Sequence, residues 1–585
     1  MKLNEGFQLL ATAPDGVARL RELIVSLAVQ GKLVSQDPSD EPATTLLQRV
    51  RHEKDSLIAD GHVKRDKPIQ RIGHVDAPFA VPAAWVWTRF GAVVMDSEAG
   101  WSPSCENVPR TTGQWGVLKV SAVSWGKFRP EENKGLPADL EPRPEYEVRR
   151  GDFLVSRANT EELVARSVIV ETDEPALMMS DKIIRLRLSE LCEPQYLNLF
   201  NNGEDARRHY IKHASGTSSS MKNVSRDVIL NLPIPLPPAA EQVRVVAKVN
   251  ELMRICDELE EQGRLEAEQH ARLRTTLFDA LAGSESPHAL AENCARVAAH
   301  FDLLLDRPEA VDALEQVILQ LAVRGRLVPQ DPKDEPASDL LRQIHARRGL
   351  QIGEGKIKRG NPLPEFGEED KAFELPEGWE AIRFGEIWDH SFYGPRFSND
   401  DYVSKGGLPT IRTTDMSGGR IVLKNAPCVL VPDDKRDAYL VQRGDLLVTR
   451  SGSIGVMALF DLELDAIPSA YLIRIRFAEQ VVPDYCLLFL TSPDGQEQIG
   501  LNTTSVGVPN VNATKMASFM MPLPPRAEQL RIVARVEELR RLCEDLRARL
   551  IARRTCQARF AEVLVEQATS NAPLVENTDD LAAAA

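Results

Sequence analysis

The sequence predicts an α+β protein in which two mixed α/β domains are separated by long, paired (coiled-coil) helices, with a pseudo-twofold internal repeat. Two observations indicate this fold class. First, residues 7–91 recur without a gap as residues 301–385, a shift of 294 (301 − 7), and residues 235–242 recur as residues 522–529, a shift of 287 (522 − 235). Second, the segments between the repeated blocks have diverged almost completely. A repeated frame around two unlike inserts predicts one scaffold that presents two different binding domains.

The bulk composition is that of a soluble, multidomain protein. A chain of 585 residues is too long for one core and predicts about three to five domains. No run of about 18 apolar residues predicts a membrane span, and the first residues lack the apolar stretch of a signal peptide. We therefore expect a cytoplasmic protein with no membrane partner.

Cysteine usage predicts neither a metal centre nor a disulfide framework. The eight cysteines contain no CxxC pair, which zinc ribbons would require. Cys256 and Cys543 occupy equivalent positions of the repeat on an apolar helix face, so we expect both to be small buried hydrophobic residues.

The first repeated block predicts two helices in each copy. Apolar residues from Leu20 to Ala28 follow the i, i+3, i+4, i+7 pattern, and Gly31 supplies a stop. A second helix is expected to start at residues 40–42, because proline is tolerated in a first helical turn. The second copy repeats the pattern from Val317 to Gly325 and at Pro336.

In each copy the Pro-Leu-Pro-Pro block ends an extended segment and precedes a long helix. The first is expected from Ala239 to about Ala282, on the order of 60 Å at about 1.5 Å per residue. Its apolar residues step by 4, 3, 4, 3, and the other copy keeps the phase, which favours coiled-coil pairing over an amphipathic helix on a globular core. The two seams are Val245, Val249, Leu252, Cys256, Leu259 and Ile532, Val536, Leu539, Cys543, Leu546, Leu550. Polar segments at residues 52–80 and 345–369 are predicted to be exposed connectors, and the tail after Gln567 to be disordered.

The two inserts predict mixed α/β domains of ordinary single-domain size. Alternating or β-branched runs predict strands. These runs are residues 117–121, 152–156 and 182–188 in the first insert, and residues 445–449 and 470–476 in the second. Residues 194–200 and 483–490 are expected to begin short helices.

Motifs for catalysis are absent from the sequence. No GxGxxG follows a predicted strand, and no phosphate-binding GxxxxGK[ST] occurs. Residues 451–455 contain two glycines but form too short a motif, and a turn is favoured. Residues 432–435 resemble part of a nuclease carboxylate site, but a solvated loop is favoured because the matching acidic-x-Lys element is missing.

One motif survives in both inserts and predicts a DNA contact. Residues 150–157 (Arg-Gly-Asp-Phe-Leu-Val-Ser-Arg) match residues 443–450 (Arg-Gly-Asp-Leu-Leu-Val-Thr-Arg). Gly-Asp predicts a tight turn into a strand that carries an arginine at its exit. This arginine suits contact with phosphate or guanine, and the alternative is a structural ion pair that closes the domain. The candidates here are Arg157, Asn159, Arg450, Ser451 and Ser453.

A polar loop near the end of each insert supplies the second group of candidates. Residues 215–225 are rich in hydroxyl and amide side chains and parallel residues 503–512, and such groups suit contacts to phosphates and base edges. A basic cluster at residues 207–213 precedes the first loop, and its alternative is a solvated helix face. The candidates are Arg207, Arg208, Lys212, Ser215, Thr217, Ser218, Lys222, Asn223, Thr503, Thr504, Asn510 and Asn512.

The order of these motifs resembles a known family, the specificity (S) subunits of type I restriction-modification systems. Residues 232–242 running into a long helix, then residues 313–327, then Leu-Pro-Glu-Gly-Trp at residues 375–379, resemble that family's central conserved region. The Gly-Asp strand and the Ser-Gly-Thr-rich loop resemble its target-recognition domains. The resemblance spans nearly the whole chain, although the helical extension before the first insert is longer than in shorter members.

The resemblance implies a domain order. The implied regions are an N-terminal helical conserved region (1–55), a linker (56–80), target-recognition domain 1 (81–235), a central conserved helical region (236–350), a linker (351–371), target-recognition domain 2 (372–521), a distal conserved helix (522–567) and the tail (568–585). It also implies that an N-terminal half-repeat, residues 7–47, pairs with the C-terminal helix at residues 528–550.

The resemblance further implies a function and partners. The chain would be non-catalytic and would bind double-stranded DNA, each recognition domain reading half of a bipartite target. Its helices would set the spacing and dock two modification subunits, with restriction subunits completing the complex. No cofactor is expected on this chain, and S-adenosylmethionine, ATP and magnesium are expected on the partners.

The net charge leaves a second class of function open. A charge of −15 is unusual for a nucleic-acid-binding protein and favours a tandem protein-interaction scaffold without DNA binding. A free-standing nuclease or methyltransferase is disfavoured by the missing motifs.

Overall fold

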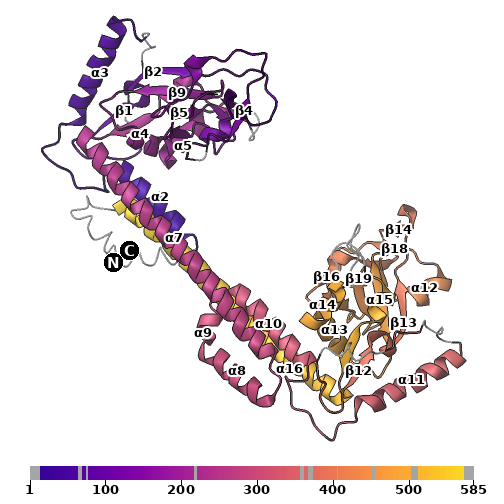
Figure 1. Ribbon diagram of the computed structural model, residues 1–585. Helices are drawn as coiled ribbons and strands as arrows, with labels where there is room; N and C mark the ends of the chain where they lie inside the picture. The colour runs from indigo at the N-terminus through magenta and orange to yellow at the C-terminus, as the bar shows by residue number, and fades with distance from the viewer. Residues whose placement is uncertain are drawn as a thin grey trace. The chain divides into compact units, whose positions relative to one another are not determined.

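A computed structural model gives the fold of most of the chain. It describes residues 13–63, 69–70, 72–73, 77–124, 126–216, 221–355, 357, 362–365, 373–404, 406–450, 455–501 and 511–571. The chain divides into two compact units, residues 1–266 with 554–585 (unit 1) and residues 267–553 (unit 2). The division falls within two long helices, α7 (Ala239–Ala282) and α16 (Arg526–Asn571), which Figure 1 labels.

Unit 1 is a mixed α/β unit. Its shorter helices are α2 (Gly16–Val29), α3 (Ala43–Ala59), α4 (Pro194–Asn202), α5 (Glu204–His213) and α6 (Arg226–Leu230). Its strands are β1 (Val86–Arg89), β2 (Val94–Ala99), β3 (Gly116–Leu118), β4 (Asn133–Gly135), β5 (Phe153–Ser156), β6 (Ala158–Asn159), β7 (Ser167–Ile169), β8 (Leu177–Met178), β9 (Ile183–Leu188), β10 (Lys222–Asn223) and β11 (Pro233–Leu236).

Unit 2 is also mixed α/β. Its shorter helices are α8 (Pro287–Ala299), α9 (Phe301–Leu304), α10 (Pro308–Val323), α11 (Ala337–Gly353), α12 (Asp433–Tyr439), α13 (Pro483–Thr491), α14 (Pro493–Leu501) and α15 (Ala513–Ala517). Its strands are β12 (Glu380–Arg383), β13 (Trp388–Tyr393), β14 (Tyr402–Val403), β15 (Leu408–Ile411), β16 (Met416–Ser417), β17 (Arg420–Ile421), β18 (Cys428–Val429), β19 (Leu446–Thr449), β20 (Met457–Leu459), β21 (Ile467–Pro468), β22 (Leu472–Phe477) and β23 (Met520–Leu523).

The two inserts have the same sheet despite their unlike sequences. The strand order β2-β9-β5-β7 in unit 1 matches β13-β22-β19-β20 in unit 2, where β17 and β16 extend the sheet. The registers also match, since Leu154 faces Arg185 as Leu447 faces Arg474. Even the irregularity near the start of β2 recurs at the start of β13. The predicted mixed α/β class of both inserts is confirmed, and positions in one insert can be matched to positions in the other.

A pair of strands closes each insert. β1 pairs antiparallel with β11, so that Arg89 lies opposite Pro233, and β12 pairs in the same way with β23, so that Arg383 lies opposite Met520. The two ends of each insert therefore leave the frame on neighbouring strands. The extended segments predicted before the long helices are confirmed as the strands β11 and β23, which end within the Pro-Leu-Pro-Pro blocks at Leu236 and Leu523.

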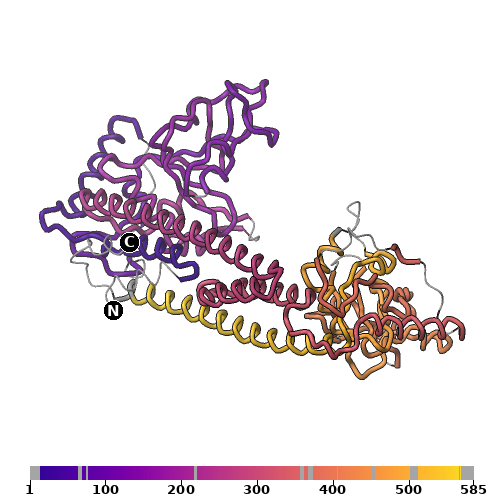
Figure 2. The backbone as a smooth tube through the Cα atoms, turned by 60° about the horizontal axis from the view of Figure 1, so that its bottom comes forward, coloured from indigo at the N-terminus to yellow at the C-terminus, as the bar shows by residue number. Residues whose placement is uncertain are grey.

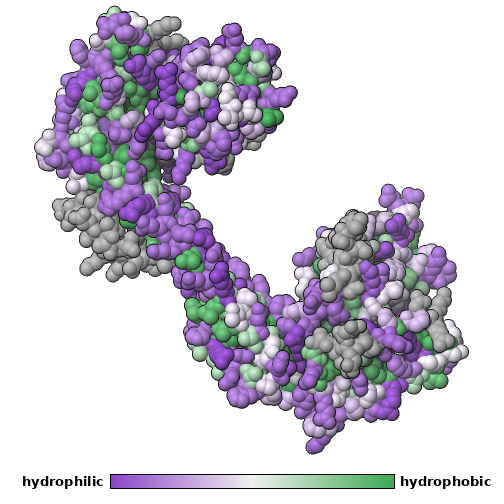
Figure 3. All heavy atoms as spheres, in the orientation of Figure 1, coloured by the Kyte–Doolittle hydropathy of each residue, from purple (hydrophilic) through white to green (hydrophobic). Residues whose placement is uncertain are grey.

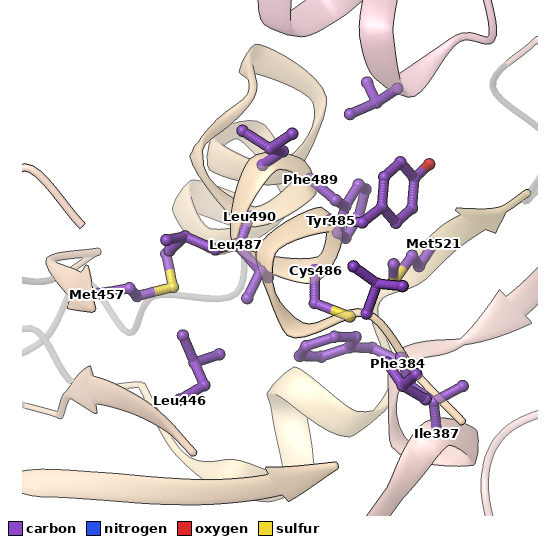
Figure 4. Close-up of a cluster of buried hydrophobic side chains, with 14 of the residues drawn as sticks. Phe384, Ile387, Leu446, Met457, Tyr485, Cys486, Leu487, Phe489, Leu490 and Met521 are labelled. Atoms are coloured by element: carbon purple, nitrogen blue, oxygen red, sulfur yellow. The ribbon is translucent and has the colours of Figure 1, made fainter. Parts of the chain in front are cut away.

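A helix packed on the sheet forms the core of the second insert. Apolar residues of α13 and the sheet face one another in Figure 4, where Phe489, Leu487 and Met457 lie in one cluster. Tyr485 at its edge is fully buried, and its hydroxyl donates to the carbonyl of Pro522, 2.9 Å away. In unit 1 the hydroxyl of Tyr196 on α4 makes the same bond to Pro235, at 2.7 Å. This bond ties the insert to the strand that leads into each long helix.

A buried tryptophan–glutamate contact joins the frame to each insert. The indole N–H of Trp85 donates to Glu241 at 2.9 Å, and that of Trp379 donates to Glu528 at 2.9 Å. A glutamine side chain of the first repeated block donates to the same carboxylate in each unit, at 2.6 Å from Gln36 and at 3.1 Å in unit 2. Burial raises the pKa of both glutamates, and these donors oppose that shift. The duplicated sequence thus produces a duplicated contact.

A glycine makes this tryptophan contact possible. Gly31, after α2, has φ +70° and a Cβ at this position would lie 2.6 Å from Pro82 and 3.1 Å from the Trp85 ring. Gly325, after α10, has φ +67° and the same neighbours in unit 2. The predicted stop at Gly31 is confirmed, because a left-handed backbone without a side chain ends the helix here.

In unit 1, α2 contacts both long helices. Arg21 pairs with Asp257 of α7 at 2.6 Å, and Arg19 approaches Glu562 of α16 at 3.9 Å. Ala561 is buried in the same apolar cluster as Ile24. Figure 2 shows these segments in indigo, magenta and yellow. The resemblance implied that the N-terminal half-repeat pairs with residues 528–550 of the C-terminal helix. In the structure, α2 instead contacts α16 at Ala561 and Glu562, closer to the C-terminal end of that helix.

In unit 2, α10 contacts the other portions of the long helices. Arg547 of α16 pairs with Asp312 and Glu315 of α10 at 2.8 and 2.9 Å. A separate apolar cluster gathers Phe278 of α7 with residues of α8, α9 and α10. Cys256 and Cys543 are buried as predicted, because each lies on the apolar face of its long helix.

Several predicted boundaries were wrong. α3 extends to Ala59 and α11 extends to Gly353, so both helices continue into the segments predicted to be connectors. No glycine or proline interrupts α3 before Gly61. A polar helix also remains stable where it faces water. The predicted strand at residues 117–121 ends at Leu118, and a 3₁₀-helix follows at Val120–Val123. The loop predicted at residues 432–435 instead leads into a helix, α12, which begins at Asp433. The tail was predicted to start after Gln567, but α16 continues to Asn571.

The surface is mostly hydrophilic. Figure 3 shows apolar residues scattered among polar ones on the visible face of each unit. Within the part of the chain that the structure describes, no helix has the length and apolar character needed to cross a membrane.

Candidate nucleic-acid interface

The Gly-Asp motif forms the tight turn that the sequence predicts. Gly151 and Gly444 have φ values of +90° and +88°, which favour glycine. The carboxylate of Asp152 accepts the N–H of Arg149 at 2.9 Å, and that of Asp445 accepts the N–H of Gln442 at 2.8 Å. The turn directs the chain into β5 or β19, at whose end the candidate arginine stands.

The same aspartate anchors an arginine of the neighbouring strand. In unit 2, Asp445 is 2% exposed and accepts two bonds from Arg476, at 2.8 and 2.6 Å, with Arg474 at 3.9 Å. In unit 1, Asp152 pairs with Arg185 at 2.9 Å, and Arg185 also binds Glu98. A structural ion pair therefore closes each domain, but it uses the aspartate of the motif and not the arginine at the strand exit.

His390 adds a titratable group to this cluster. Its Nε2 accepts a hydrogen bond from Arg474 at 3.0 Å, which requires the neutral ring. Burial, with Arg474 and Arg476 nearby, lowers the pKa of His390 to about 4, although Asp445 opposes the shift.

We expect unit 2 to lose stability in mild acid because of His390. The unfolded chain takes up this proton near the usual pKa of 6.5, whereas the folded chain does so near 4, so stability present above pH 6.5 is lost as the pH falls toward 4. The loss should be about 2 kcal/mol after allowance for solvent screening. Denaturant titrations between pH 4 and 7 should show a flatter profile for His390→Gln than for the unchanged chain, and equal profiles would contradict this role of His390.

The arginines at the two strand exits have the same backbone contacts. The N–H of Arg157 donates to the carbonyl of Lys182 at 2.8 Å, and its carbonyl accepts the N–H of Val224 at 2.9 Å. The N–H of Arg450 donates to Tyr471 at 3.0 Å, and its carbonyl accepts from Val511 at 3.2 Å. The fold therefore fixes the backbone of both arginines between the end of one strand and the polar loop near the end of the insert.

The side chains of these arginines are available for a ligand. Among the described residues, no carboxylate lies within 4.0 Å of either guanidinium. Arg157 is exposed, and Arg450 is half-buried with its guanidinium carbon 5.0 Å from the centre of the Tyr393 ring.

Four of the candidates in unit 1 are brought next to Arg157. β6 pairs with β10, so that Lys222 lies opposite Asn159, and Ser215 bridges to Asn223. The Asn159 amide donates to the Ser124 hydroxyl at 2.8 Å, and the Lys222 ammonium lies 3.2 Å from the carbonyl of Gly216 and 3.8 Å from Glu161. Residues far apart in sequence thus form one polar surface.

Arg207 does not belong to this surface, which corrects its predicted role. It is 9% exposed, and its guanidinium donates to the carbonyls of Val164, Ala165 and Asn201. It also lies over the Tyr210 ring at 5.0 Å. Burial and these bonds make Arg207 a structural residue that holds α5 against the loop before β7.

Arg208 and Lys212 are exposed on α5, one turn apart. Arg208 pairs with Asp205 at 2.5 Å, within its own helix. Their predicted DNA contacts stay predictions, as does the alternative of a solvated helix face.

Asn512 has a local role in unit 2. Its side-chain oxygen accepts the N–H of Lys515 at 2.8 Å and caps α15, as Ser225 caps α6 in unit 1. The side chain is exposed, so this role leaves room for a ligand contact. The remaining candidates lie outside the described residues: Thr217, Ser218, Ser451, Ser453, Thr503, Thr504 and Asn510.

Sequence reasoning missed three residues beside the arginines. Lys182 and Tyr471 occupy equivalent positions and accept the N–H of Arg157 and Arg450, and Tyr393 lies against Arg450. These residues belong to strand ends in the diverged inserts. They are identified by the matched strand registers of the two sheets, and these registers are known only from the structure.

Metal ligation finds no support in the described ranges. There, no three His, Cys, Asp or Glu side chains gather as a metal site would need.

Comparisons with known proteins agree on one family. A family model described as type I restriction modification DNA specificity domain matches residues 133–269 and 376–553. The type I restriction enzyme EcoEI specificity subunit of Escherichia coli is 31% identical over 582 residues, covering 94% of this chain and 94% of that protein. The EcoAI specificity subunit of the same species is 31% identical over 566 residues, with the same coverage.

A solved structure shares the fold. It comes from work on complex assembly and conformational transition of the type I R-M system, and its chain has a TM-score of 0.50 at 18% identity. The match covers 85% of this chain and 100% of that one.

Proposed function

The chain belongs to the family of type I restriction-modification specificity subunits, and from this membership we propose that each insert reads one half of a bipartite, double-stranded DNA target. One observation carries the proposal. Two inserts with the same strand order and register present an arginine at the same strand exit, but surround it with different side chains. A shared backbone with different surface groups is what recognition of two different half-sites requires, because base edges are distinguished by the donors and acceptors that face them.

The chain itself supplies recognition, and its partners supply the chemistry. The named relatives are specificity subunits of type I restriction enzymes. We propose that two modification subunits carry S-adenosylmethionine and methylate adenine on the bound DNA. Restriction subunits that use ATP and magnesium would complete the nuclease, and this chain would bind none of these cofactors.

DNA binding by the complex tests the function directly. We expect the purified chain with its modification subunits to retard a duplex that contains the target, and to release it steeply as salt rises, because phosphate contacts displace counterions. Shuffled half-sites should bind more weakly. Equal binding of target and shuffled duplexes, or no binding at low salt, would support the rival function as a protein-interaction scaffold.

The long helices are proposed to pair as a coiled coil with pseudo-twofold symmetry and to set the spacing of the half-sites. Two apolar clusters that contain residues of both long helices support this: Ala561 of α16 lies with the seam of α7 in unit 1, and Leu546 of α16 packs against the cluster of Phe278 of α7 in unit 2. The seam residues themselves are buried in clusters with α2 in unit 1 and with α10 in unit 2. Two readers on a spacer must keep a fixed phase on a duplex whose turn repeats every ~34 Å.

Removing one heptad from each helix should therefore shorten the preferred gap. The matched segments are residues 261–267 of α7 and 548–554 of α16, which are equivalent at the shift of 287 (548 − 261). Seven residues span about 10 Å, roughly three base pairs, and a whole heptad keeps the seam in phase. Methylation of a library of spacer lengths measures the optimum. Deletion from one helix alone serves as the control, and an unchanged optimum after the paired deletion would contradict the role in spacing.

A further inference from the structure

The two recognition domains differ in the groups that surround their equivalent arginines. The matched registers make Ala99 equivalent to Tyr393. Ala99 lies opposite Ile184, the second residue of β9, and Tyr393 lies opposite Ile473, the second residue of β22. The shared backbone bond pairs Lys182 with Tyr471. The first domain thus combines an arginine with a lysine, and the second combines an arginine with two tyrosines.

In the second domain the arginine is held in place. Its guanidinium carbon lies 5.0 Å from the centre of the Tyr393 ring, a stacking contact that fixes a planar group. Tyr393 is itself fixed, because its hydroxyl accepts the N–H of Ala513 at 3.0 Å. A guanidinium with a fixed plane loses little freedom when it forms two parallel hydrogen bonds, and guanine offers the matching O6 and N7 acceptors.

In the first domain, no aromatic ring of the described residues lies over the guanidinium of Arg157. Ala99 presents only a methyl group where Tyr393 presents a ring. Arg157 and Lys182 are both exposed, and among the described residues no carboxylate lies within 4.0 Å of the Lys182 ammonium. The neighbouring Asp181 is bonded to the hydroxyl of Ser102 at 2.5 Å. Two flexible cations side by side suit the charge of phosphate and place little constraint on the base.

Tyr471 is a second residue by which the two domains differ beside their arginines. The residue is 62% exposed, although its backbone carbonyl is fixed by the N–H of Arg450. An exposed ring beside an oriented guanidinium offers an apolar face to a base edge or to a thymine methyl group.

We propose that Arg450, oriented by Tyr393 and flanked by Tyr471, reads a base pair in the second half-site, whereas Arg157 and Lys182 bind the DNA backbone in the first. Arg450 and Tyr471 are then specificity-determining residues and Tyr393 is a positioning residue. This assignment rests on the proposed function, since it concerns the same interface.

Charge-conserving substitutions test the assignment. The full chain with its modification subunits is used to methylate the target and duplexes with single base pairs changed in either half-site. Arg450→Lys should lower the ratio of target to changed-site methylation about 5- to 150-fold, because a lysine has no planar fork of donors for the Tyr393 ring to orient. Arg157→Lys should change its ratio by less than about threefold, and Arg157→Ala should weaken binding on every sequence and reduce the salt slope by about 1.

The tyrosines supply the matched controls. Tyr393→Ala should lower the ratio in the same half-site as Arg450→Lys, while Tyr393→Phe, which keeps the ring but loses the bond to Ala513, should lower it less. Tyr471→Lys introduces the residue that Lys182 supplies at the equivalent position of the first domain. This variant should lower the ratio of target to changed-site methylation in the second half-site without changing the midpoint of thermal unfolding. Equal effects of Arg450→Lys and Arg157→Lys, or an unchanged ratio in Tyr393→Ala, would overturn the assignment. A wild-type complex that methylates no bipartite target would instead overturn the proposed function.

Discussion

Replacing Asp445 with alanine is expected to lower the free energy of unfolding of unit 2 by about 3–5 kcal/mol, because the change leaves buried arginines without their counter-charge. Asp445 is 2% exposed, accepts two hydrogen bonds from Arg476 and lies 3.9 Å from Arg474, which is itself 2% exposed. The carboxylate also closes the turn into β19 through the N–H of Gln442. Losing this side chain should therefore loosen the turn that places Arg450.

The equivalent change in unit 1 is the matched control. The side chain of Asp152 is 18% exposed, and its partner Arg185 keeps Glu98 and the carbonyl of Glu147. Asp152→Ala should cost less, about 1–2 kcal/mol. Hydrogen exchange of the amides in β19 and β22, compared with those in β5 and β9, assigns the loss to the correct unit. Equal losses in the two units would show that the buried charge in unit 2 has no special weight.

Replacing Trp379 with alanine should destabilise unit 2 by about 3–5 kcal/mol through the cavity that the indole leaves. The ring is 6% exposed and packs edge-on against Tyr485 with centres 6.5 Å apart. Trp379→Phe keeps most of the apolar contact but removes the N–H that binds Glu528 at 2.9 Å. That smaller change should still cost about 1–3 kcal/mol, because a buried carboxylate loses a donor.

A second tryptophan separates the hydrogen bond from the packing. Trp388 is 5% exposed, and its indole N–H has no hydrogen-bond partner among the described residues. Trp388→Phe loses no such bond, so it should cost clearly less than Trp379→Phe in denaturant titrations followed by fluorescence. Similar costs for the two substitutions would mean that the bond to Glu528 contributes little.

The frame could be predicted from the sequence because it is present twice. A glycine after each helix, a tryptophan before each insert and a glutamate at the start of each long helix appear as repeats, and the structure shows that they contact one another. The long helix from Ala239 to Ala282 was predicted with its correct ends. Gly263 does not interrupt it, although a glycine inside a helix costs stability.

The site was predicted less completely, for physical reasons. The motif located Arg157 and Arg450, but side-chain chemistry alone cannot tell a surface arginine from a buried one that binds three carbonyls, as Arg207 does. Tyr393 and Tyr471 could not be found, because they are brought to Arg450 by pairing between strands far apart in sequence. The connectors were misjudged since a polar helix and a polar loop have similar composition.

The pairing of β1 with β11, and of β12 with β23, has a consequence for evolution. Each insert begins and ends on adjacent strands, so the chain enters and leaves the insert at one place. Substitutions elsewhere in an insert can accumulate without disturbing the packing of the helices, provided that these strands, the tryptophan–glutamate contact and the contacts of the insert with the frame persist. One such contact is the pair of Arg324, which follows α10, with Asp494 of α14 at 2.9 Å. Such an arrangement allows selection to change what one insert recognises while the other insert and the helices are kept, which accounts for two inserts that share a fold and almost no sequence.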